Sequence, residues 1–107
     1  MENQNKIFVA MISQPIDNNH YAAMKYDRNK AKQFLESTGW VVKNTFFKDS
    51  KKSKEAKHSE IFYLSKSIKE MADVDMIYFL KGWENSPECK IEHEIAKQYG
   101  IKIQYEE

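Results

Sequence analysis

The sequence predicts an α/β protein of the flavodoxin-like class, a three-layer sandwich in which a parallel sheet of four or five strands is covered by helices on both faces. Two observations predict this class. Short apolar runs alternate along the chain with longer stretches of helical periodicity, as in consecutive strand–helix–strand units. The 107 residues are the size of a single domain, here residues 1–107, with one hydrophobic core. Because such crossovers are right-handed and keep successive strands parallel, we expect the strand order 2-1-3-4.

The amino-terminal half is predicted to form two strands separated by one helix. Ile7–Ile12 is a mostly apolar run bounded by polar residues, which is typical of a strand buried on both faces. From His20 to Thr38 apolar side chains recur at helical spacing, and Gly39 follows where a helix C-terminal cap belongs. Trp40–Phe47 is rich in β-branched and aromatic residues, so we expect it to be the second strand.

The carboxyl-terminal half is predicted to add two helices and two strands. Lys48–Lys57 is too hydrophilic to enter the core, and we expect it to be a loop. Helical spacing resumes over Ile61–Ala72 and is followed by an apolar, strand-like run at Met76–Leu80. The last helix spans Ser86–Tyr99, and a short strand, Ile101–Gln104, completes the sheet.

The charge balance gives no indication of a nucleic-acid or membrane partner. Seventeen Lys and Arg residues against sixteen Asp and Glu residues leave a formal net charge of +1. The polar amino terminus lacks the apolar region of a signal peptide, and no run approaches the roughly 20 apolar residues of a membrane span. A lone cysteine, Cys89, fits a reducing compartment. We therefore expect a cytoplasmic protein that binds neither nucleic acid nor membranes.

The pattern of histidines and cysteine does not predict a metal site. His20, His58 and His93 are widely spaced and form no metal-ligand pattern with the single cysteine. We expect no metal and no other cofactor.

The last predicted helix carries the strongest indication of a functional site. Ser86-Pro87-Glu88 is a typical helix start, and Glu92 falls inside the apolar arc of the helix, one turn beyond Glu88. Ionising a carboxylate on a core face is costly unless it has partners. Glu92 is therefore either a hydrogen-bonded structural residue or a nucleophile or general base at a ligand crevice, and Ser86 is either a simple cap or a ligand contact.

A ligand crevice is expected at the carboxyl edge of the sheet, where the strand order reverses. That point lies between the loops after the first and third strands, which places Ser13 on one side and Gly82 and Trp83 on the other. An aromatic residue such as Trp83 either stacks on a nucleobase there or packs in the core or at a subunit interface. The candidate residues are Glu92 for catalysis and, for substrate binding, Ser13, Gly82, Trp83, Ser86 and Glu88.

Several segments carry a resemblance to a known family. They are Lys6–Ala10, Pro15-Ile16, Gly39–Val42 with Asn44, Asp75–Ser86, Cys89 and Glu92–Ala96. Together they resemble the nucleoside 2-deoxyribosyltransferase superfamily, with most similarity to its small phage and bacterial members of unknown function. They are also similar to the 2'-deoxynucleoside 5'-monophosphate N-hydrolases. The resemblance implies cleavage or exchange of the N-glycosidic bond of a deoxynucleoside or its monophosphate, without a cofactor, by a homodimer or higher homo-oligomer.

The resemblance also implies roles for residues of the last helix. Glu92 matches the glutamate that attacks the anomeric carbon in the transferases. Ser86 matches a serine that helps to hold phosphate in the N-hydrolases, and a helix N-terminus suits an anion. Glu88 stands where relatives have glycine, and its charge opposes a phosphate. We therefore expect only a modest preference for monophosphates over nucleosides.

Two further positions differ from the transferase pattern. Phe8 replaces a tyrosine that some transferases use near the nucleophile, and Ser67 lies near a position where many relatives have a base-binding aspartate. These differences keep a second hypothesis open, that of a non-catalytic protein which uses the same crevice to sequester or sense a nucleotide.

Overall fold

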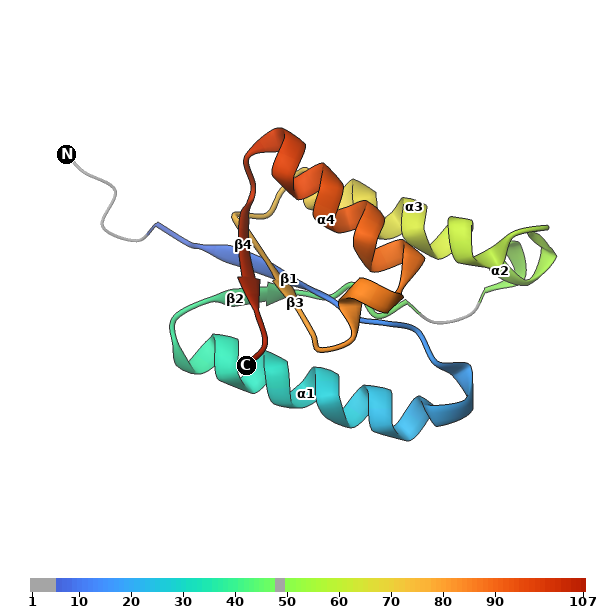
Figure 1. Ribbon diagram of the computed structural model, residues 1–107, viewed down its shortest axis with the longest axis horizontal. Helices are drawn as coiled ribbons and strands as arrows, with labels where there is room; N and C mark the ends of the chain where they lie inside the picture. The colour runs from blue at the N-terminus through green and yellow to red at the C-terminus, as the bar shows by residue number, and fades with distance from the viewer. Residues whose placement is uncertain (1–5, 48–49) are drawn as a thin grey trace.

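The computed structural model describes residues 6–47 and 50–107 and has the predicted α/β architecture (Figure 1). The strands of the described chain are Val9–Ser13 (β1), Val41–Lys43 (β2), Met76–Phe79 (β3) and Lys102–Tyr105 (β4). Its α-helices are Tyr21–Ser37 (α1), Lys51–Glu55 (α2), Ser59–Met71 (α3) and Pro87–Tyr99 (α4), and short 3-10 turns span Asn18–His20 and Trp83–Asn85.

The four strands form one sheet in which every neighbouring pair is parallel. Their order is β2-β1-β3-β4, which confirms the predicted order 2-1-3-4. The central strands β1 and β3 are almost entirely buried, which explains why both are apolar runs rather than alternating patterns. The predicted first strand, Ile7–Ile12, is displaced along the chain, since pairing covers Val9–Ser13.

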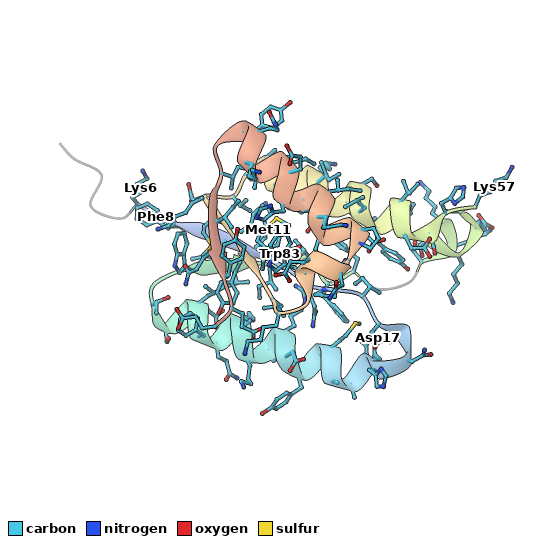
Figure 2. The ribbon with its side chains drawn as sticks, viewed as in Figure 1. Lys6, Phe8, Met11, Asp17, Lys57 and Trp83 are labelled. Atoms are coloured by element: carbon cyan, nitrogen blue, oxygen red, sulfur yellow. The ribbon has the colours of Figure 1, made fainter. Side chains whose placement is uncertain are left out.

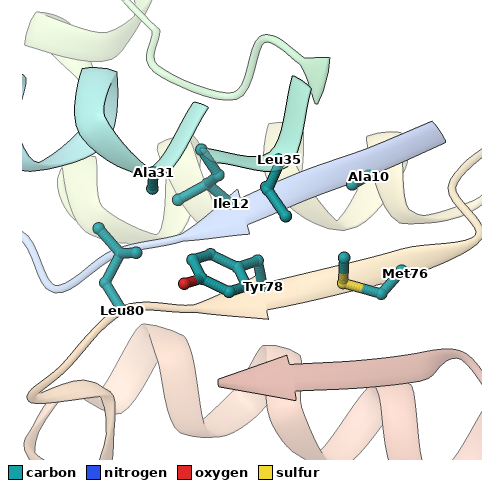
Figure 3. Packing of buried hydrophobic residues seen from close by; sticks show 7 residues of the cluster. All are labelled: Ala10, Ile12, Ala31, Leu35, Met76, Tyr78 and Leu80. Atoms are coloured by element: carbon teal, nitrogen blue, oxygen red, sulfur yellow. The ribbon is translucent and has the colours of Figure 1, made fainter. Parts of the chain in front are cut away.

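Helices cover both faces of this sheet, so the architecture has three layers (Figure 1). Helix α1 packs on one face through Ala31 and Leu35, which join a buried cluster with β1 and β3. Figure 3 shows the members of this cluster, which are Ala10, Ile12, Ala31, Leu35, Met76, Tyr78 and Leu80. Helices α3 and α4 cover the opposite face, where Met71, Cys89 and Ala96 pack against alternate residues of the same strands.

Strand β2 is shorter than the predicted segment Trp40–Phe47 because pairing with β1 stops at Lys43. Immediately afterwards the Asn44 side chain accepts a hydrogen bond from the Phe46 backbone amide at 2.9 Å, a local bond that turns the chain. The buried Thr45 hydroxyl donates to the Ile12 carbonyl at 3.1 Å. The aromatic end of the predicted strand is therefore folded over the carboxyl end of β1.

The lysine-rich tract Lys48–Lys57 is not wholly a loop as predicted, because it contains helix α2. Lys48, its first residue, lies outside the described residues. Ser50 and Ser53 cap α2 reciprocally, and the buried Ser53 hydroxyl accepts a hydrogen bond from Tyr63 of α3 at 3.0 Å. These contacts fix the helix, while the lysines of α2 remain exposed.

No helix in the described part of the chain combines the length and the apolar character needed to cross a membrane.

We predict that Leu35→Ala lowers the free energy of unfolding by about 2–5 kcal/mol, since it leaves a cavity between α1 and the sheet. Leu35 is fully buried, whereas Gln33 on the same helix is exposed and serves as the control. Gln33→Ala should stay within about 0.5 kcal/mol of the wild type. Urea unfolding followed by circular dichroism measures both, and equal losses would contradict the packing described above.

Candidate functional site

Helix α4 begins as the sequence predicts and brings Glu92 onto its buried face. The Ser86 hydroxyl caps the helix by accepting from the Cys89 amide, Pro87 is the first helical residue, and Gly100 ends the helix with a φ of 71°. Glu92 is only 5% exposed. The buried face of α4 is narrower than the predicted apolar arc, since Ile91 and Tyr99 are exposed and Cys89, Glu92 and Ala96 are buried.

Glu92 lies in the wall of a cavity of about 420 Å³ at the carboxyl ends of β1 and β2. The walls come from the loops after these strands and from helices α1, α3 and α4. They are formed by Ile12, Ser13, Gln14, Ile16, Tyr21, Met24, Arg28, Thr45, Phe46, Phe47, Ser59, Glu60, Tyr63, Leu64, Ser67, Glu88, Cys89 and Glu92. The cavity therefore occupies the edge of the sheet where parallel α/β proteins bind ligands.

A polar part of the cavity wall centres on the Glu92 carboxylate. Ser13, the last residue of β1, donates a hydrogen bond from its hydroxyl to Glu92 Oε1 at 2.5 Å. Ser67 of α3 also hydrogen-bonds the carboxylate. Glu88 lies one turn earlier on α4 and lines the same cavity. Two acidic side chains and two hydroxyls from three elements thus contribute to this part of the wall.

The cavity wall also carries several aromatic side chains. Tyr21 and Phe46 lie with ring centroids 5.6 Å apart, and Phe47 and Tyr63 also line the cavity. Such a site suits a ligand that has one hydroxyl-rich part and one flat ring, because aromatic side chains favour stacking and polar groups fix orientation.

A polar network that sequence reasoning missed lies in the same cavity wall. Arg28 of α1 donates from Nε to Gln14 Oε1 at 3.1 Å, from Nη1 to Thr45 Oγ1 at 3.2 Å and from Nη2 to the Ile12 carbonyl at 3.3 Å. Gln14 in turn donates to the Met24 carbonyl at 2.7 Å. The available signal was that Arg28 is the only arginine among the 17 basic residues.

Burial dominates the electrostatics of the site. It raises the pKa of Glu92, and the charge of Glu88 adds to that rise, whereas the Ser13 hydrogen bond and the Arg28 charge oppose it. Burial also raises the pKa of Cys89. Desolvation lowers the pKa of Arg28 to about 10, so the guanidinium stays positively charged at neutral pH.

The structure brings together only part of the residues predicted for the site. Ser13, Glu88 and Glu92 line the cavity. Ser86 is buried beside it as the cap of α4, and its hydroxyl donates to Glu88 Oε1 at 3.3 Å. It contacts the site through Glu88 rather than forming its wall.

Trp83 and Gly82 are not part of the cavity wall. Trp83 packs against the cluster that contains Met11 (Figure 2) and stacks on His93, with ring centroids 4.2 Å apart. Gly82 has a φ of 90° and supplies the turn before Trp83. The Trp83 ring therefore packs against neighbouring side chains outside this cavity wall.

Within residues 6–47 and 50–107, no group of three or more His, Cys, Asp and Glu side chains is arranged to hold a metal ion.

A family model described as a domain of unknown function (DUF4406) matches residues 11–105. The chain belongs to this family. Neither the curated proteins nor the solved structures contain a match. Every described residue of the cavity wall, from Ile12 to Glu92, lies inside the matched range. The candidate site is therefore contained in the DUF4406 domain.

We predict that Glu92→Gln gains stability relative to the wild-type DUF4406 domain as the pH rises. The folded-state pKa of Glu92 lies above its unfolded value, so between these two pKa values the folded state binds more protons than the unfolded state. Wild-type stability therefore falls as the pH rises through the folded-state pKa. The amide does not titrate, so the difference in unfolding free energy should widen with pH. Urea unfolding at a series of pH values from pH 4 upward, spaced by about one pH unit, measures this difference.

The exposed Glu94 on the same helix provides the matched control for replacing a carboxylate by an amide. A difference between Glu92→Gln and wild type that shrinks with rising pH would mean that the native site prefers the carboxylate.

Proposed function

We propose that the protein cleaves or exchanges the N-glycosidic bond of a 2'-deoxynucleoside or its 5'-monophosphate, with Glu92 as the nucleophile. The observation that carries the proposal is a carboxylate, 5% exposed, in the wall of a cavity that is lined by both polar and aromatic side chains. A structural glutamate needs no cavity beside it. Perturbed, buried carboxylates in clefts are typical of catalytic sites.

The sequence resemblance supports the same chemistry. Glu92 matches the catalytic glutamate of the nucleoside 2-deoxyribosyltransferase superfamily, and the fold is compatible with the flavodoxin-like sheet expected of its members. The aromatic side chains of the cavity wall, Tyr21 and Phe46 among them, suit a nucleobase, and the hydroxyls of Ser13 and Ser67 suit a sugar.

The proposed reaction proceeds in two displacements. A carboxylate oxygen of Glu92 bonds to the anomeric carbon as the bond from that carbon to the base nitrogen breaks, and the electron pair stays with the base, which takes up a proton. The product is a glycosyl ester of Glu92. Attack by water on the anomeric carbon then releases the sugar, a proton and the free carboxylate, whereas attack by a second base gives exchange.

Incubation with mixed deoxynucleosides and their monophosphates, followed by mass spectrometry, tests the proposal. Released base with free sugar indicates a hydrolase, and exchanged nucleosides indicate a transferase. A ligand that binds without base release or a covalent adduct would contradict the proposal and favour a protein that sequesters or senses a nucleotide.

We predict that Glu92→Ala and Glu92→Gln lose base release by several orders of magnitude while keeping the fold, since both remove the nucleophile and neither buries a new charge. Release of free base is measured by chromatography, and circular dichroism checks the fold. Glu94→Gln, which changes an exposed carboxylate on the same helix, should retain full activity. If the Glu92→Gln protein is folded and still releases base, Glu92 is not the nucleophile.

We predict that Glu88→Gly strengthens binding of a 5'-monophosphate relative to its nucleoside by roughly two- to five-fold, the size of a helix-terminus charge effect. In the wild type the Glu88 carboxylate accepts a hydrogen bond from the Ser86 hydroxyl, and it competes with any anion for the start of α4. Binding isotherms for both ligands measure the change. Glu88→Gln tests whether charge alone is responsible, and the absence of any gain in either variant would place the phosphate elsewhere.

A further inference from the structure

Arg28 is the only arginine in a sequence whose other basic residues are lysines, and its side chain enters the cavity wall. A lysine at this position supplies the same charge, but it cannot hold three acceptors in one plane. Arg28 does so with Gln14, Thr45 and the Ile12 carbonyl, which come from β1 and from the loops after β1 and β2. The guanidinium is therefore fixed at one place in the wall.

The acceptors that hold Arg28 are all uncharged. Among residues 6–47 and 50–107, no carboxylate forms an ion pair with it. The centroid of the Phe46 ring lies 5.4 Å from the guanidinium carbon, within the range of a cation–π contact. A half-buried cation thus retains a charge that no direct partner neutralises.

Consecutive residues of β1 connect this cation to Glu92. The Ile12 carbonyl accepts from Arg28, and the next residue, Ser13, donates to the Glu92 carboxylate. The two charged groups therefore lie on either side of the end of β1, in the walls of one cavity, without touching. Opposite charges in the wall of one cavity attract more strongly than in water because their surroundings are partly desolvated.

We propose that Arg28 is a positioning residue that favours the ionised form of Glu92 against the effect of burial, acting through its charge across the cavity rather than through a salt bridge. Its catalytic consequence rests on the function proposed above, since only an ionised carboxylate attacks the anomeric carbon. The electrostatic effect itself is a property of the folded protein and exists without any substrate.

The other groups that face Glu92 do not supply this charge. From α3, Glu60 adds a negative charge to the cavity wall and Ser67 adds a hydroxyl. From α4, Glu88 is a second negative charge, and Cys89 is a thiol whose pKa is raised. Within the described wall, Arg28 is the only cationic side chain. Removing it leaves Glu92 with acidic neighbours and neutral hydrogen-bond donors.

The test is the titration of Glu92, observed by carbon NMR of protein labelled at the glutamate side-chain carboxyl carbon. The Glu92 signal is assigned by its absence from Glu92→Gln. In Arg28→Met the midpoint should move to higher pH than in the wild type, and in Arg28→Lys, which keeps the charge, it should stay closer to the wild-type value. Lys25→Met removes one charge from the exposed side of the same helix and should leave the midpoint unchanged.

Arg28→Gln replaces Arg28→Met if the latter does not fold, because its amide retains hydrogen-bond donors without the charge. The proposal is overturned if the neutral variants titrate like the wild type, or if Arg28→Lys moves the midpoint as far as they do.

If the wild type releases base, the acid limb of its kcat/KM profile should move in parallel with the NMR midpoint. A displaced midpoint in a protein that shows no base release would uphold the role of Arg28 and contradict only the proposed function.

Discussion

The hydrogen bond from Ser13 to Glu92 joins the end of the central strand β1 to the middle of α4, and the organisation of the site depends on it. Helix α4 packs on the sheet through Cys89 and Ala96, so a glutamate between them has to be buried. A buried carboxylate requires donors, which Ser13 and Ser67 supply. Since β1 lies between β2 and β3, this contact holds Glu92 at the centre of the sheet's carboxyl edge.

The features of the fold that follow from long apolar patterns were predictable. The runs that become β1 and β3 are buried on both faces, and crossover connections fix their parallel order. The residues at which helices and strands end were harder to predict from the sequence because they depend on single side chains. Asn44 turns the chain after β2, and Ser50 with Ser53 caps α2, in segments whose composition indicates only a strand and a loop.

The residues of the candidate site also differ in how far local sequence could predict them. Glu92 was predictable because a carboxylate within an apolar helix face is unusual in local sequence. Arg28 was not, because Asp27 and Asn29 beside it make its segment resemble a solvated helix face, and only the folded chain brings Thr45 and Gln14 to it. The sequence left two interpretations of Trp83, a ligand contact or a packing residue. Its ring stacks on His93, a partner ten residues later that local sequence does not indicate.

The cavity walls come from residues as far apart in sequence as Ile12 and Glu92, so the unfolded chain has no binding site. Any ligand that occupies the cavity must therefore stabilise the fold by linkage, by about 2.7 kcal/mol at a concentration 100-fold above its dissociation constant. The melting temperature of the protein therefore rises when a ligand binds in the cavity. Nucleosides, nucleotides and free bases can be ranked by thermal shift without assuming any reaction.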